Sequence, residues 1–296
     1  MLALAGVGAF AQPGPLAGNE ARLVEALREA ERLHGPQHLE VARRLDALAE
    51  WHASQGRLAQ ALPLFQRSLA IQERLYGSDD LRLANALNNL AELHRVLGQL
   101  PQALALHRRN LALVEKQRGA QHPDVATSLS NLGLVLQTLG QFDEAIALHR
   151  RSLAIREQRL GADPLAVANS LNNLAEVYRA VGPHAQAVPL YERSLAIVER
   201  QLGADHPIAA TLLANQAGLY MLMGRFDLAL PCAQRSVAIR EKRSGRSIRS
   251  WRWAFRSWPR CIARSATCSA RCRCCNAAWR CSSRRSAPST PMSRWR

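Results

Sequence analysis

The chain is built on one motif, which reads ANSLNNLAEVYRAVGPHAQAVPLYERSLAIVERQLG at Ala168 to Gly203. Two related copies precede it, ATSLSNLGLVLQTLGQFDEAIALHRRSLAIREQRLG at Ala126 to Gly161 and ANALNNLAELHRVLGQLPQALALHRRNLALVEKQRG at Ala84 to Gly119. The copies follow one another at a spacing of 42 residues. Self-similarity at a fixed period of this size is typical of a solenoid, in which each unit buries its apolar face on its neighbours.

The same pattern extends over residues 19–245, as a half-repeat at 19–35 followed by five 42-residue repeats. Each full repeat has a glycine between its two predicted helices and another at its end. The first set comprises Gly56, Gly98, Gly140, Gly182 and Gly224, and the second comprises Gly77, Gly119, Gly161, Gly203 and Gly245. Because glycine just past a helix end accepts the left-handed conformation, both sets predict helix ends.

Within each repeat the apolar residues have helical spacing. In the reference copy, Leu171, Leu174 and Tyr178 share one face of the first helix, which we call helix A. The second helix, helix B, has a small residue at a fixed place in all five repeats, which predicts a close helix crossing. These residues are Ala61, Ala103, Ala145, Ala187 and Ala229.

The spacing of Leu174, Ala175, Tyr178, Gly182 and Ala187 resembles the tetratricopeptide repeat. The 42-residue period, the LNNLA core and the His-Pro openings resemble the kinesin light chain type of that repeat. The resemblance implies an all-α fold, a right-handed superhelical solenoid of antiparallel helix pairs. It also implies a concave groove, lined by the A helices, that binds extended peptides.

Asparagines recur on the predicted groove side of the A helices, at Asn85, Asn88, Asn89, Asn131, Asn169, Asn172, Asn173 and Asn215. Asparagine inside a helix costs up to ~0.7 kcal/mol relative to alanine, so its recurrence suggests a recurring benefit. Each amide offers two donors and an acceptor to a peptide backbone. Arg95 and Arg179 lie one turn further on and could pair with an acidic ligand group. We therefore predict a peptide-binding site at these ten residues.

A structural reading of the same asparagines stays open. Their side chains could hydrogen-bond between adjacent repeats and hold the angle between them, and both roles can hold at once. The first repeat has Ala47 at the ladder position, so we expect the groove to weaken there.

Two charged rows recur in step on the B helices. The arginines are Arg67, Arg109, Arg151, Arg193 and Arg235, and the glutamates are Glu31, Glu73, Glu115, Glu157, Glu199 and Glu241. This recurrence suggests ion pairs between repeats, although solvated helix faces would give the same pattern. Exposed pairs contribute only ~0–1 kcal/mol each, and we assign them no function.

No catalytic motif stands out. The chain lacks H-E-x-x-H, a Gly-rich phosphate loop and G-x-S-x-G, and its histidines are scattered at framework or surface positions. Cys232 stands alone and reads as a small core residue. We expect a protein that is not an enzyme, with no cofactor, no metal and no small-molecule substrate.

The net charge of +16 comes mainly from the end of the chain. Arg246 to Arg296 contain 13 arginines and no acidic residue, which leaves a net charge of only +3 for the rest. Back-translation of this tail in the shifted frame, with third bases chosen from those that the genetic code allows, yields glycine, alanine and His-Pro at framework positions in the 42-residue phase. We therefore interpret residues 246–296 as frameshifted and expect them to be disordered, which makes nucleic-acid binding through the tail the least favoured function.

The start of the chain, residues 1–18, is apolar. Leu2 to Ala11 resemble the core and cleavage site of a secretory signal peptide, but a basic segment before them is missing. The segment is either a truncated signal peptide or merely an apolar N-terminus, and we favour export slightly over a cytoplasmic location. No other segment approaches the length of a membrane span, so we expect a soluble body with no span.

These features favour a non-enzymatic scaffold that binds an extended peptide of a protein partner in the A-helix groove. An accessory or regulatory module of a larger, truncated protein is the alternative, because function inferred from fold is an analogy.

Overall fold

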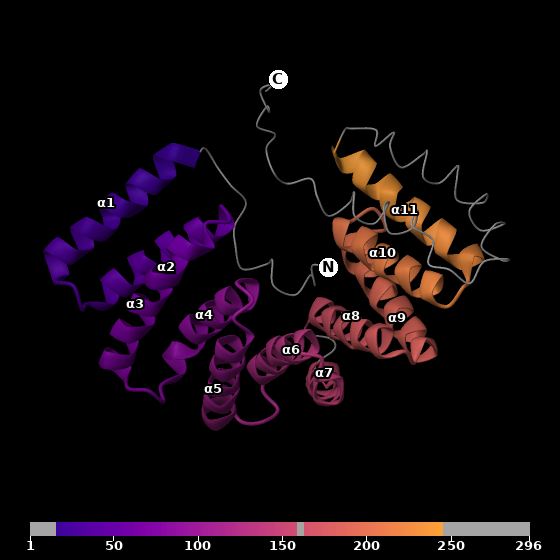
Figure 1. Ribbon diagram of the computed structural model, residues 1–296, viewed down its shortest axis with the longest axis horizontal. Helices are drawn as coiled ribbons and strands as arrows, with labels where there is room; N and C mark the ends of the chain where they lie inside the picture. Colours follow the sequence, from indigo (N-terminus) through magenta and orange to yellow (C-terminus); the bar gives the residue numbers. More distant parts are fainter. Residues whose placement is uncertain (1–15, 159–162, 245–296) are drawn as a thin grey trace, which may run out of the picture. The chain divides into compact units, whose positions relative to one another are not determined.

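The computed structural model describes residues 16–158 and 163–244, and within them every regular element is a helix (Figure 1). The half-repeat forms α1 (Leu16–His34). The A helices are α2 (Leu39–Ser54), α4 (Ala84–Val96), α6 (Pro123–Thr138), α8 (Pro164–Val181) and α10 (Pro207–Leu222). The B helices are α3 (Leu58–Tyr76), α5 (Leu100–Arg118), α7 (Phe142–Glu157), α9 (His184–Leu202) and α11 (Phe226–Ser244). A short 3-10 helix, η2 (Leu81–Leu83), leads into α4.

The predicted all-α solenoid of helix pairs is confirmed. Consecutive helices from α1 through α10 pack against one another, and the described residues up to Val237 belong to one compact unit. The predicted signal-like segment lies largely, and the frameshifted tail wholly, outside the described residues.

The glycines between paired helices adopt the predicted left-handed conformation. Their φ angles are 74° at Gly56, 76° at Gly98, 78° at Gly140, 118° at Gly182 and 71° at Gly224. A side chain at such a φ is strained, which explains why the residue recurs while the sequence around it varies. The closing glycines Gly35, Gly77, Gly119 and Gly203 also have positive φ; Gly161 and Gly245 lie outside the described residues.

Most of the A helices begin with a side-chain cap. The Nδ1 atoms of His38, His122 and His206 each accept a hydrogen bond from the backbone N–H two residues later, at 3.2 to 3.3 Å. In the fourth repeat Asp163 takes this role and accepts from Ala166 N; in the second repeat Asp80 accepts from Arg82 N and caps η2, and α4 itself has no side-chain cap. These bonds satisfy N–H groups that have no partner inside the helix.

Within a repeat, the two helices cross at small residues. The predicted alanines of the B helices are 0–1% exposed at Ala61, Ala103, Ala145, Ala187 and Ala229. Close to this crossing, B-helix serines donate hydrogen bonds of 2.5 to 3.1 Å to A-helix carbonyls 26 residues earlier. The four pairs are Ser68 with Ala42, Ser152 with Ala126, Ser194 with Ala168 and Ser236 with Ala210.

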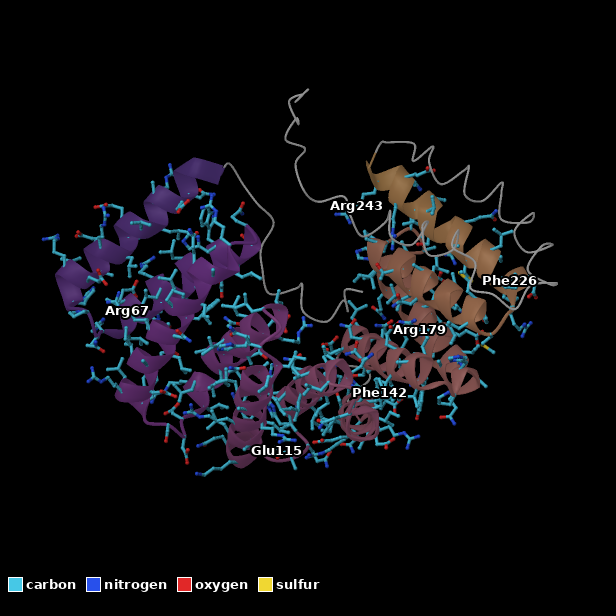
Figure 2. All side chains as sticks on the ribbon, in the orientation of Figure 1. Arg67, Glu115, Phe142, Arg179, Phe226 and Arg243 are labelled. Carbon is cyan, nitrogen blue, oxygen red and sulfur yellow. The ribbon has the colours of Figure 1, made fainter. Side chains whose placement is uncertain are left out.

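The two charged rows are joined by ion pairs between repeats, which is one of the two interpretations left open above. Each arginine contacts the glutamate 36 residues earlier, on the B helix before it, at 2.5 to 2.7 Å. Figure 2 labels one member of each row, Arg67 on α3 and Glu115 on α5. Both partners of every pair are substantially exposed, so each pair stabilises the array by less than about 1 kcal/mol.

The first helix covers the apolar end of the array. Leu27 and Ala30 of α1 are buried with Val41 and Leu45 of α2. The opposite side of α1 carries exposed intrahelical ion pairs, including Arg32 with Glu29 at 2.7 Å. A terminal unit with a polar outer face is what a solenoid requires to remain soluble.

Candidate peptide-binding face

The asparagines lie in matching places on consecutive A helices. Asn89 lies on α4, Asn131 on α6, Asn173 on α8 and Asn215 on α10. We call the side of α4, α6, α8 and α10 that carries the ten predicted residues the asparagine face. The regular register follows from the 42-residue period, because equal spacing places the same helical side of each repeat in the same direction.

Amide groups on this face link neighbouring repeats. Asn131 Nδ2 donates to Asn88 Oδ1 at 2.7 Å, and Asn215 Nδ2 donates to Asn172 Oδ1 at 3.1 Å. At the beginning of the ladder, Asn89 Nδ2 donates to a carboxylate of the first repeat, Glu50 Oε1, at 3.3 Å. The structural role left open above is therefore present in the molecule.

The asparagines differ in how much of each side chain is accessible. Asn172 and Asn173 are only 8% and 4% exposed. Asn85 and Asn169, one turn earlier on α4 and α8, are exposed, and neither makes a side-chain hydrogen bond within the described residues. The two exposed amides are thus ones that do not link repeats, whereas Asn131 and Asn215 are half-buried and do.

Arg95 and Arg179 are each neutralised by a glutamate on the same helix. Arg95 pairs with Glu92 at 2.5 Å and Arg179 with Glu176 at 2.6 Å, with all four side chains less than 20% exposed. In the fourth repeat the Tyr191 hydroxyl also donates to Glu176; Arg179 is labelled in Figure 2. An acidic ligand group at either arginine would have to compete with a carboxylate already in place.

The first repeat has a different character on this side. Asp46 Oδ2 accepts a hydrogen bond from Gln72 Nε2 at 3.2 Å, and burial raises the pKa of Asp46 to about 6. Burial also raises the pKa of Glu50, against the opposing effect of the Asn89 hydrogen bond. Asparagine is absent from the ladder position here, where Ala47 stands, so the ladder begins at Asn89.

Two buried histidines were not singled out by sequence reasoning. His107 is 1% and His149 is 0% exposed, and no ring nitrogen of either has a hydrogen-bond partner in the described residues. Burial lowers the pKa of both to about 4. The signal was available in the repeat, since the same position holds Phe65 and Tyr191 in other copies and is therefore an aromatic core position.

Sequence reasoning also missed Arg156 of α7. Its guanidinium reaches α6 and α8 and contacts oxygen atoms of Thr127, Ala166 and Ser170. Among the other repeats only the fifth has an arginine at this position, Arg240, so arginine does not recur there regularly enough to be noticed in the sequence.

The described residues contain no group of three or more His, Cys, Asp or Glu side chains placed to hold a metal ion. Among the same residues, no helix has the length and apolar character that crossing a membrane requires.

The sequence and the fold were compared with known proteins. A family model for the tetratricopeptide repeat matches residues 20–74, 45–109, 82–158 and 166–242. A search of the curated proteins finds no significant match.

Solved structures with this fold include BtubC (BKLC) from P. vanneervenii, with a TM-score of 0.65 and 23% identity over 79% of this chain and 94% of that one. Another is a Podosopora anserina protein described as a kinesin light chain with nearly identical TPR-like repeats. Its TM-score is 0.60 at 26% identity, over 73% of this chain and all of that one. Helix pairs, glycine turns and the family match agree, so the chain belongs to the tetratricopeptide repeat family, whose arrays are scaffolds for protein interaction.

Proposed function

We propose that the protein is a non-enzymatic scaffold that binds an extended peptide segment of a partner protein along the asparagine face. The observation that supports this most is the unused hydrogen-bonding capacity of the amides. The links described above use one N–H of Asn131 and one N–H of Asn215. Each side chain retains a second N–H and a carbonyl oxygen, which match the donors and acceptors of a peptide backbone.

Asn85 and Asn169 support a binding role more directly. Both lie inside helices, where asparagine costs up to ~0.7 kcal/mol relative to alanine. Neither makes a side-chain hydrogen bond within the described residues that would offset this cost. A ligand that contacts both amides offers a reason for their presence in two repeats.

The spacing of the helices sets the length of the ligand. Packed helices lie ~8–10 Å apart, and an extended chain advances ~3.3 Å per residue. The face from α4 to α10 includes three such steps, so the ligand segment has about nine residues. Its backbone would run across the A helices and meet one amide-bearing helix about every three residues.

The test begins with selection of random twelve-residue peptides on the full chain by phage display. Dissociation constants of selected peptides are then measured for the Asn85→Ala/Asn169→Ala variant. We expect at least tenfold weaker binding for two lost amide contacts of about 1 kcal/mol each. Helicity should be retained and thermal stability should be equal to or higher than that of the wild type, because alanine is more favourable than asparagine inside both helices.

A matched variant, Asn131→Ala/Asn215→Ala, removes the amides that link repeats. It should weaken peptide binding and also lower the free energy of unfolding by about 1–2 kcal/mol, from two lost hydrogen bonds. Failure to select any peptide, or unchanged affinity in Asn85→Ala/Asn169→Ala, would count against this function.

A further inference from the structure

Arg156 is a cation held among neutral oxygen atoms. From α7 its Nη1 donates to Ala166 O at 3.1 Å and to Ser170 Oγ at 2.7 Å, both on α8. Its Nη2 donates to Thr127 Oγ1 of α6 at 3.3 Å. Thr127 is exposed, and it lies at the same repeat position as Asn85 and Asn169 of the asparagine face. The guanidinium therefore reaches the asparagine face between the third and fourth repeats.

Within residues 16–158 and 163–244, no observed ion pair joins Arg156 to an Asp or Glu side chain. By contrast, the next arginine back on the same helix, Arg151, pairs with Glu115 at 2.7 Å. Burial lowers the pKa of Arg156, and the charge of Asp163 opposes this only in part. A partly buried charge with no ion-pair partner is costly, which makes Arg156 an unusual residue to keep.

The fold does not require an arginine at this position. The corresponding residues in the other repeats are Gln72, Val114, Val198 and Arg240. Helices α3, α5 and α9 thus form the same packing with an uncharged side chain. Because three other repeats pack without a charged side chain here, packing alone does not explain the guanidinium.

Within the part of the chain that the structure describes, some N–H groups of Arg156 have no acceptor. A guanidinium has five N–H groups. The three hydrogen bonds described above use two at Nη1 and one at Nη2. Nε–H and one Nη2–H then have no acceptor among the described residues. A carboxylate binds such a guanidinium through two parallel hydrogen bonds.

The remainder of the asparagine face carries little net charge. The charged pairs Glu92–Arg95 on α4 and Glu176–Arg179 on α8 are internally balanced. Helix α10 has no charged residue at all. In α6 the charge is confined to Asp124 in the first turn. A ligand lying across these helices therefore meets one partly buried charge that has no observed ion pair.

We propose that Arg156 is the carboxylate subsite of the asparagine face, and that it binds an Asp or Glu side chain of the peptide. The favoured ligand is an extended segment with one acidic residue at this point and uncharged residues on either side. This inference rests on the proposed function, and it moves the recognition of an acidic group from Arg95 and Arg179 to Arg156.

The experiment selects random twelve-residue peptides by phage display on the full chain and on three variants. Arg156→Gln has the residue that Gln72 supplies in the first repeat, so the packing is expected to tolerate it. Arg156→Lys retains the charge. Arg151→Gln removes a neighbouring cation that is already paired, and it serves as the matched control. Circular dichroism and thermal unfolding verify that each variant is folded.

On the wild-type chain, the aligned peptides should show Asp or Glu at one position at least about tenfold above its input frequency, as a charge-assisted hydrogen bond implies. The preference should disappear on Arg156→Gln, persist in weaker form on Arg156→Lys and be unchanged on Arg151→Gln. For one selected peptide, replacing the acidic residue by its amide should weaken binding about tenfold to the wild type and not at all to Arg156→Gln.

Two results would overturn the subsite while leaving the proposed function in place. Selected peptides could lack an acidic position, or the acidic preference could survive in Arg156→Gln. If no peptide is selected on the wild-type chain, the proposed function fails and the subsite fails with it.

Discussion

The two buried histidines make the stability of the array depend on acidity. His107 and His149 are shielded from water, and burial lowers the pKa of each to about 4, with smaller contributions from Arg95 and Arg156 respectively. In the unfolded chain a histidine has a pKa of about 6.5. Between these two values the unfolded state binds more protons than the folded state, so the free energy of unfolding falls as the pH falls.

The size of the effect follows from the two pKa values. From pH 7 to pH 5, each histidine should lower the free energy of unfolding by about 2 kcal/mol, or about 4 kcal/mol together. Asp46 acts in the opposite direction, because its pKa is raised to about 6 and the folded state binds the additional proton. This contribution offsets about 1 kcal/mol over the same range. The histidines therefore dominate, and below pH 4 the loss should level off.

The assay is urea unfolding followed by circular dichroism at pH 5, 6 and 7. It compares the wild type with His107→Phe/His149→Phe, in which both positions have the residue found at Phe65. The histidine caps His38, His122 and His206 are present in both proteins, so the difference between them isolates the two core histidines. His34→Gln, a change at an exposed position, is the control and should retain the wild-type pH dependence. The reasoning is wrong if the double phenylalanine variant loses as much stability between pH 7 and pH 5 as the wild type.

Three further predictions concern single contacts. Asp46→Asn should raise the free energy of unfolding at pH 7 by about 1–2 kcal/mol, because it removes a carboxylate whose ionisation opposes folding; unfolding measured at pH 4 should show little gain. Gly133→Ala should destabilise by about 1–3 kcal/mol in thermal unfolding, since its Cβ would lie 2.7 Å from the His149 ring; adding His149→Ala should make the Gly133→Ala change much less costly. Ser194→Ala should lower the free energy of unfolding, measured with urea, by about 1 kcal/mol, because the Ser194 hydroxyl donates to the buried Ala168 carbonyl at 2.8 Å. Arg193→Ala, on the exposed side of the same helix, should lower it by less.

The architecture could be predicted from the sequence because a 42-residue period fixes many positions at once. Glycines such as Gly98 and Gly140, and the row of alanines at the helix crossing, were assigned by recurrence, and the structure confirms their roles. The ion pairs of the B helices were suggested by the same recurrence. The 42-residue period alone could not show whether these arginines and glutamates form ion pairs or are separately exposed to water, because both arrangements repeat the charges in the same way.

Details that depend on side-chain direction could not be predicted. The recurrence of the asparagines was visible in the sequence, yet which of them link repeats depends on hydrogen bonds such as Asn131 to Asn88. The pairing of Arg95 with Glu92 depends on the side-chain rotamers of both residues. The contacts of Arg156 depend on how far its side chain extends from α7 toward α6 and α8. The sequence shows His122 and His206 as His-Pro pairs at the start of their repeats. It does not show that they cap helices, because capping depends on the orientation of the ring and its Nδ1 atom.

The central claim is that a partner peptide lies along the asparagine face. A crystal structure of the full chain with a peptide selected by display tests it most directly. We expect an extended peptide across α4, α6, α8 and α10, with its backbone about 3 Å from the amides of Asn85 and Asn169. A peptide bound to the B helices, or one that makes no contact with either amide, would contradict the account.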